Sequence, residues 1–190
     1  MSLFERLYDL VLAFWRNATY CAALTQELAR AMPVAQRPPA GMAYLAGLLS
    51  RFGYLLLGHL FPAQFFLLNH VIDANRDLGV RDVEKYVLGV SHEQIGGWLL
   101  QSWRMPEELV TAVRYQHRAD YYGSHAAYAG LNLIANRLLK RRGIGYASHE
   151  LLPSHVLQAL GISETEAMER LARVMEQGEG VESLAHQLAA

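Results

Sequence analysis

Apolar residues recur every three or four positions along most of the chain, and this spacing constrains the fold more than any other sequence feature. Residues three and four apart lie on one face of an α-helix. The first such series predicts one long amphipathic helix, which Pro33 ends; its apolar positions are Phe4, Leu7, Val11, Phe14, Ala18, Cys21, Leu24 and Leu28. No segment shows the strict alternation of a half-buried strand, and no Asn-Gly or Asp-Gly hairpin turn occurs. The sequence therefore predicts an all-α fold.

Prolines, glycines and capping residues divide the rest of the chain into further helices. Three prolines between residues 33 and 39 predict a loop. Ser91 with Gln94, and Ser163 with Glu166, have the spacing of a capping box at a helix N-terminus. The expected helices after the loop span residues 42–56, 62–75, 82–88, 92–103, 106–117 and 123–142, with smaller helices over 153–161, from 163 onward and over 181–188.

Charged residues are scarce for a soluble domain. The 190-residue chain has 17 Lys and Arg against 18 Asp and Glu, and charged residues make up 18% of it while apolar ones make up 52%. This composition excludes a disordered chain, and near-neutral charge argues against a DNA-binding surface. The shortage of charge has two explanations: a large core, or apolar surface reserved for a partner.

The sequence gives no sign of export or of a membrane span. Glu5, Arg6 and Asp9 interrupt any apolar signal segment near the N-terminus. Polar residues also interrupt the most apolar stretch, residues 44–72. Cys21, the only cysteine, is expected to be a buried thiol in a reducing compartment. We therefore expect a cytoplasmic protein without a membrane partner.

A particular order of short segments points to a known family. These segments are Phe14-Trp15-Arg16-Asn17, the stretch from Ala46 to Gly53, Gly89 to Leu100, Trp103-Arg104-Met105-Pro106, Ala112 to His117, and Leu133 to Asn136. Together they resemble the HDOD family, the regulatory branch of the HD phosphohydrolase superfamily. The resemblance implies an HD-like multi-helix bundle over residues 1–143, with a C-terminal helical extension over 144–190 packed on it. It also implies a role in bacterial signal transduction.

The same resemblance identifies where a metal site would lie. In the metal-dependent relatives, a histidine, an adjacent His-Asp pair and a late aspartate hold a divalent cation that activates water against a phosphate ester. The corresponding residues here are Asn17, the pair Ser50 and Arg51, and Asn136. Two unit charges about 4 Å apart interact by about 4 kcal/mol at an effective dielectric of 20, so Arg51 would repel a cation.

Only His92 and His117 remain of the wider histidine set. Two imidazoles are fewer than the three protein ligands of a usual catalytic zinc site. We therefore expect a pseudoenzyme with no cofactor, no metal ligands and no catalytic residues. The two histidines are either the remnant of a ligand pocket or, as we favour, helix-end residues hydrogen-bonded within the bundle.

The leading hypothesis is a non-catalytic regulatory module that acts through a protein partner or through self-association. One alternative is a divergent metal-dependent phosphohydrolase, acting on a nucleotide or phosphate ester around His92 and His117. Another is a sensor that binds an anion or small molecule beside Arg51, whose side chain either fills the vacated pocket and bonds Asn17 or Asn136, or is solvated.

Other conspicuous residues have an ordinary structural explanation. Trp98 and Trp103 are expected in the core rather than in a ligand platform, and Tyr121-Tyr122 form a core pair rather than a pocket wall. Lys140-Arg141-Arg142 before Gly143 is typical of a helix end, with phosphate or nucleic-acid contact as the less favoured alternative.

HDOD proteins usually carry a helical bundle before this region, and the sequence does not contain it. We therefore expect either a short family member or a chain shortened at its front. In both cases apolar surface between Phe4 and Phe14 should be uncovered and shared with a second copy or another domain.

Overall fold

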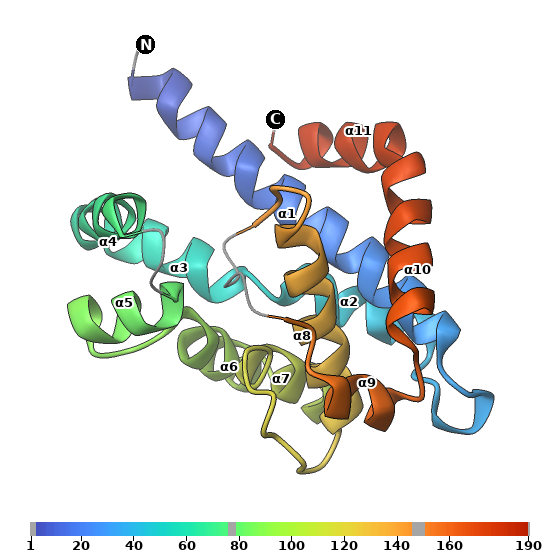
Figure 1. The fold of residues 1–190 in the computed structure, drawn as a ribbon. Helices are drawn as coiled ribbons and strands as arrows, with labels where there is room; N and C mark the ends of the chain where they lie inside the picture. Colours follow the sequence, from blue (N-terminus) through green and yellow to red (C-terminus); the bar gives the residue numbers. More distant parts are fainter. Residues whose placement is uncertain (1–2, 76–78, 146–150, 190) are drawn as a thin grey trace.

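The computed structural model describes residues 3–75, 79–145 and 151–189, of which residues 3–7, 10 and 73 are described by their backbone alone. The described residues form helices and connecting loops without a β-strand, which confirms the all-α prediction (Figure 1). The elements are α1 (Leu3–Ala31), a 3₁₀ turn η1 (Val34–Gln36), α2 (Ala40–Leu49), α3 (Phe52–Leu60), α4 (Pro62–Ala74), α5 (Val80–Leu88), α6 (His92–Ser102), α7 (Glu107–Arg114), α8 (Ala126–Lys140), α9 (Ser154–Leu160), α10 (Glu164–Glu176) and α11 (Gly178–Ala189).

Most helix ends lie where local sequence signals place them. Both capping boxes form, and in the second the Glu166 carboxylate accepts from the Ser163 backbone N–H at 2.8 Å. Gly143 follows α8 with a φ of 73°, the left-handed conformation that ends a helix. The predicted helix 123–142 is too long at its start, because His125 has a left-handed backbone (φ 58°) immediately before α8.

The predicted helix 42–56 is instead two helices, α2 and α3, that meet at Ser50 and Arg51. Arg51 leaves helical geometry with φ −105° and ψ 3°. The Ser50 carbonyl accepts a hydrogen bond from Gln116 Nε2 at 2.7 Å, which substitutes for a bond within one continuous helix. Contacts from another part of the chain therefore accompany a break that the local sequence does not signal.

The long helix α1 is the centre of the structure and contacts α2, α8, α10 and α11 (Figure 1). One hydrophobic cluster joins α1 and α8 to the C-terminal helices, through residues that include Leu24, Leu28, Leu138, Leu160 and Leu171. A second cluster joins α2, α6, α7 and α8, and a third joins α3, α4 and α5. The C-terminal helices pack on α1 and α8, while the boundary at residue 143 stays a prediction.

Two glycines allow the helices around the break to pack backbone against backbone. A Cβ at Gly53 in α3 would lie 1.8 Å from the His92 carbonyl oxygen at the start of α6. A Cβ at Gly47 in α2 would lie 2.6 Å from the Cys21 carbonyl oxygen in α1. These contacts hold Arg51, which lies between the two glycines in sequence, close to α1 and α6.

One stretch of the described residues, Ala40–Leu60, is long and apolar enough to cross a membrane by length and composition. Half of it is buried in the protein, and the chain departs from helical geometry within it at Arg51. It is therefore built into the helical core of this fold.

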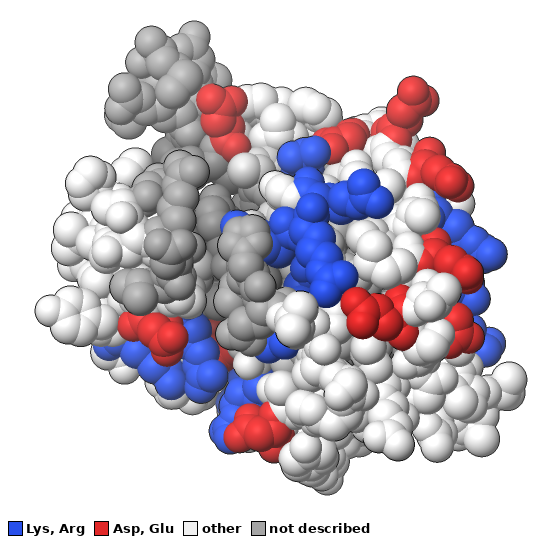
Figure 2. All heavy atoms as spheres, viewed as in Figure 1, with Lys and Arg blue, Asp and Glu red and all other residues white. Residues whose placement is uncertain are grey.

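Large parts of the face shown in Figure 2 carry no charged side chain among the described residues. In this view, Lys and Arg side chains gather over the C-terminal end of α8, with acidic residues beside them. Lys140 donates to the Gly145 carbonyl at 3.4 Å, and Arg141 pairs with Glu164 at 3.4 Å. These contacts favour the helix-end interpretation of the basic cluster.

Candidate functional site

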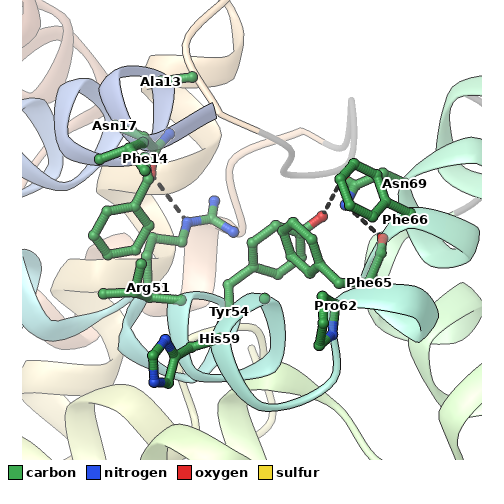
Figure 3. A pocket seen from close by; sticks show the side chains of 13 residues that line it. Ala13, Phe14, Asn17, Arg51, Tyr54, His59, Pro62, Phe65, Phe66 and Asn69 are labelled. Atoms are coloured by element: carbon green, nitrogen blue, oxygen red, sulfur yellow. Dashed lines mark hydrogen bonds between the residues drawn. The ribbon is translucent and has the colours of Figure 1, made fainter. Parts of the chain in front are cut away.

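The Arg51 side chain points into the interior and bridges two asparagines, as one of the two expectations for this residue stated. Its Nε donates to Asn17 Oδ1 at 3.0 Å, and its Nη2 donates to Asn136 Oδ1 at 3.3 Å (Figure 3 shows the first bond). Only 4% of Arg51 is exposed. Three residues that the resemblance assigns to a metal site are thus held together by a guanidinium group.

Further buried polar groups support this bridge. Asn136 Nδ2 donates to Gln116 Oε1 at 3.3 Å, and Gln116 in turn bonds the Ser50 carbonyl. The Ser50 hydroxyl lies 3.7 Å from the Cys21 sulfur. Burial raises the pKa of the Cys21 thiol, so it is a protonated core residue as expected.

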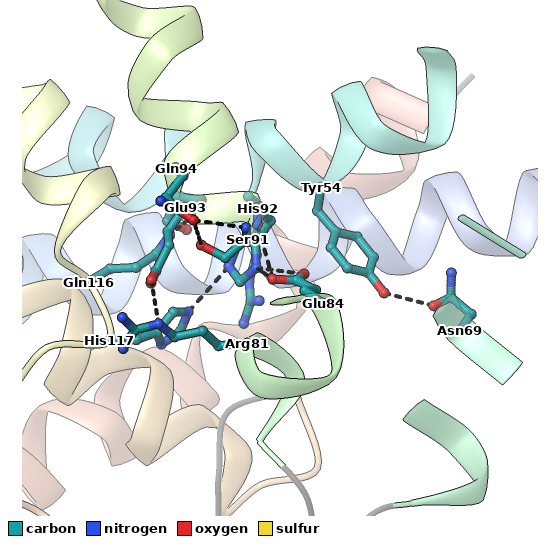
Figure 4. Close-up of polar contacts among 12 residues, drawn as sticks. Tyr54, Asn69, Arg81, Glu84, Ser91, His92, Glu93, Gln94, Gln116 and His117 are labelled. Carbon is teal, nitrogen blue, oxygen red and sulfur yellow. Dashed lines mark hydrogen bonds and ion pairs between the residues drawn. The ribbon is translucent and has the colours of Figure 1, made fainter. Parts of the chain in front are cut away.

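His92, the first residue of α6, and His117, which follows α7, face each other closely (Figure 4). Their Nε2 atoms lie 3.2 Å apart, and His92 Nδ1 lies 2.8 Å from both carboxylate oxygens of Glu84. Glu84 also accepts from the His92 backbone N–H at 3.0 Å and is fully buried. Since a carboxylate only accepts, His92 carries a proton on Nδ1, and a single further hydrogen lies between the Nε2 atoms of the two rings.

Electrostatics keep His117 neutral. Burial lowers the pKa of His117 well below 6.5, and the nearby His92 and Arg51 lower it further. Glu93, next to His92, forms an ion pair with Arg81 at 2.8 Å, yet burial raises the pKa of its carboxyl group. The favoured interpretation of the two histidines, hydrogen bonding within the bundle, matches this geometry.

These residues do not fit a divalent cation. The amide oxygens of Asn17 and Asn136 accept from Arg51, and both ring nitrogens of His92 are engaged by Glu84 and His117. In the part of the chain that the structure describes, no group of three His, Cys, Asp or Glu side chains is arranged to hold a metal ion. The amide oxygens that could otherwise bind a metal ion are already hydrogen-bonded to the positively charged guanidinium group of Arg51.

Sequence reasoning missed Glu84 and Gln116. Glu84 stands on the apolar face of α5, in the series Val80, Val83, Glu84, Val87 with spacing i, i+3, i+4, i+7. An acidic residue within such a series needs a buried partner, and this signal could have identified it. Gln116 carries no comparable signal.

Both tryptophans were wrongly assigned to the core. Trp98 is 56% exposed and Trp103 is 54% exposed on α6 and just after it. Gly96 and Gly97 take the buried face of α6 instead, because there the helix lies too close to its neighbours for large side chains. Trp103 contacts the ring of Phe52 edge to face, at a centroid distance of 6.3 Å.

The tyrosine pair is also not a core pair. Tyr121 stacks on Tyr115 with 3.9 Å between ring centroids, while Tyr122 is 74% exposed. The expected apolar surface near the N-terminus is only partly described, since the side chains of Phe4 and Leu7 lie outside the described residues. Within the described part Tyr8 is exposed, whereas Phe14 is half-buried.

Comparisons with known proteins agree with this architecture. A solved structure of a candidate signal transduction protein from Marinobacter aquaeolei is 33% identical, with a TM-score of 0.88 over 93% of this chain and 39% of that chain. A candidate phosphohydrolase from Shewanella amazonensis is 22% identical, with a TM-score of 0.72 over 95% of this chain and 64% of that one.

A Treponema pallidum protein described only as uncharacterized is 23% identical over 138 residues, which is 70% of this chain and 26% of the relative. The chain thus spans about a quarter of that relative and about two fifths of the Marinobacter chain. The family model of the HDOD domain matches residues 3–119. This match covers more than half of the sequence and includes Asn17, Arg51, His92 and His117, and the chain therefore belongs to the HDOD domain family.

Proposed function

We propose that this chain is a non-catalytic signal transduction module of the HDOD family, which acts through contacts with other protein surfaces in the bacterial cytoplasm. The observation that carries the proposal is the bridge from Arg51 to Asn17 and Asn136. A positive charge fixed there repels the divalent cation on which HD-type hydrolysis depends.

The histidine pair supports the same proposal. A catalytic metal needs imidazole nitrogens with free lone pairs, but His92 directs Nδ1 to Glu84 and Nε2 to His117. The contacts of His92 connect α5, α6 and the segment after α7, as expected for a residue with a structural role. In this proposal the helical framework of the family is kept, while the residues that would bind the catalytic metal ion are replaced.

Exposed apolar side chains favour contact with other proteins. One group lies on α3–α4 and the turn between them: Leu60 (55% exposed), Phe61 (51%), Phe66 (49%) and Leu67 (54%). A second lies on and just after α6: Trp98 and Trp103. Aromatic residues are enriched in protein interfaces, and clustered exposed apolar residues often mark such contacts.

Two measurements on the purified protein test the proposal. Elemental analysis with a phosphodiesterase screen should find no stoichiometric transition metal and no turnover. A bound metal together with turnover that His117→Ala abolishes would overturn the non-catalytic assignment. Sizing and a pull-down of binding partners should show self-association or a protein partner, and a monomer without partners would contradict the contact-based role.

A further inference from the structure

A cavity of about 240 Å³ lies between the first half of α1 and the helices α3 and α4 (Figure 3). Its walls are mainly apolar, and they include Val11, Phe14, Leu55, Phe65 and Phe66. Arg51, Asn17, Tyr54, His59 and Asn69 supply its polar groups, and no Asp or Glu is among the described residues that line it. The cavity therefore combines a mainly apolar wall with one cationic group, the guanidinium of Arg51.

Arg51 lines this cavity without a compensating negative charge. Its two hydrogen bonds go to neutral amide oxygens, and it forms no ion pair with any described residue. These two hydrogen bonds use two of the five N–H donors of the guanidinium. The Nη1 atom forms no hydrogen bond in the described part of the chain. Keeping an arginine 4% exposed without a carboxylate is costly, and an anion in the cavity would offset that cost.

Asn17, which holds Arg51 through its amide oxygen, has an unused donor of its own. Its Nδ2 atom is buried and has no hydrogen-bond partner in the described structure, although only 6% of the residue is exposed. Buried donors are paired in most proteins, so this one adds to the polar cost of the region around Arg51. The Nδ2 atom lies against Gly145 rather than on the open cavity, and the preference for an anionic oxygen therefore rests on Arg51.

We propose that this cavity binds a small carboxylate with an apolar tail, the carboxylate on Arg51 and the tail along the aromatic wall. A cavity of 150 Å³ holds one benzene, so 240 Å³ corresponds to on the order of ten non-hydrogen atoms. Octanoate has about that size. The proposal does not depend on the role in protein contacts, although Phe66 belongs both to the cavity wall and to the exposed group on α3–α4.

Phosphate esters fit this site poorly. A doubly charged phosphate needs several donors and a wet surrounding, whereas Arg51 is the one Lys or Arg among the described lining residues and most of the wall is apolar. A single carboxylate matches a single guanidinium, and an apolar tail gains from burial against Phe14 and Phe65.

Calorimetric titration of the full chain near neutral pH tests the proposal with octanoate as the probe. Octanoate should bind one per chain, and 1-octanol and octylamine should bind at least about tenfold more weakly, since a charged hydrogen bond is lost. Acetate, which lacks the tail, should also bind at least about tenfold more weakly. Equal affinity for octanol and octanoate would overturn the proposal, as would the absence of octanoate binding.

Two variants locate the site. Arg51→Gln should lose the preference for octanoate over octanol. Because this buried residue also supports the fold, Ala13→Trp gives a second test: Ala13 is exposed and lines the cavity, so a tryptophan there should block binding. Ala172→Trp, at an exposed position on α10, is the matched control and should bind normally. Octanoate binding unchanged in Ala13→Trp would overturn the assignment of this cavity.

Discussion

His117 and His92 share a single hydrogen between Nε2 atoms that are 3.2 Å apart. Protonating His117 would add a positive charge to a buried ring that lies beside His92 and Arg51. This relationship makes stability dependent on pH, because the folded protein resists a proton that the unfolded chain accepts.

The free energy of unfolding should fall as the pH drops below 6.5. The unfolded chain binds a proton on His117 at its ordinary pKa of 6.5, while the folded protein, with its lowered pKa, does not. Because of this histidine, the free energy of unfolding should fall by up to about 1.4 kcal/mol for each pH unit below 6.5. Well above pH 6.5 the histidine should have no such effect.

Denaturant melts of the wild type and of His117→Gln over this range check the prediction. Glu93, whose raised pKa acts in the opposite direction as the pH rises above 4.5, is present in both proteins and cancels in the difference. Parallel pH profiles for the two proteins would contradict the assignment to His117.

Removing the Glu84 carboxylate should destabilise the fold strongly. Glu84→Ala leaves the backbone N–H and Nδ1–H of His92 buried without an acceptor, at a cost of about 2 to 5 kcal/mol. Glu84→Gln, which keeps one acceptor oxygen, should lose less. Chemical denaturation measures both, and a Glu84→Ala loss similar to that of an exposed control such as Glu169→Ala would contradict the role of Glu84.

A methyl group at Gly53 should disrupt the contact between α3 and α6. The new Cβ would lie 1.8 Å from the His92 carbonyl oxygen, which is backbone and cannot rotate away, so a loss of about 3 kcal/mol or more is expected. Gly41→Ala is the matched control: nothing lies within 4 Å of its Cβ, and helix propensity predicts a gain of about 0.5 to 1 kcal/mol. Thermal melts that rank the two variants in the reverse order would disprove this packing argument.

Replacing the exposed tryptophans should weaken protein association more than folding. Trp98→Ser with Trp103→Ser removes exposed aromatic surface, so stability should change by about 1 kcal/mol or less. Sedimentation velocity should show reduced self-association relative to the wild type. Tyr86→Ser, at a residue 91% exposed on α5, serves as the control and should leave association unchanged. If the double variant associates like the wild type, Trp98 and Trp103 do not belong to the contact surface.

Local signals were sufficient for most of the fold. Pro33, Pro62 and Gly143 set helix ends through their own backbone conformations, and the capping box at Ser163 does so through bonds to Glu166. The break at Arg51 was not predictable, because it coincides with contacts from Gln116, Asn17 and Asn136, which are distant in sequence.

The candidate site divides in the same way. The resemblance marked Asn17, Arg51, His92, His117 and Asn136, and the structure brings them into one region. Neither the pairing of Glu84 with His92 nor the exposure of Trp98 follows from helix periodicity. The exposure of Trp98 depends on the close contacts of Gly53 and Gly96, which bring another face of α6 against α3 and α7. Glu84 meets His92 only when α5 and α6 have folded together.

The helix α1 gives one face to α2 and α8 and another to α10 and α11. Tyr20, Leu24 and Leu28 thereby belong to a core shared with Leu171 and Val174, which lie far beyond the 3–119 family match. A gene fusion that carried only the matched segment would leave this face of α1 without its cover. The unit that recombination can move between proteins as a working whole therefore includes α10 and α11.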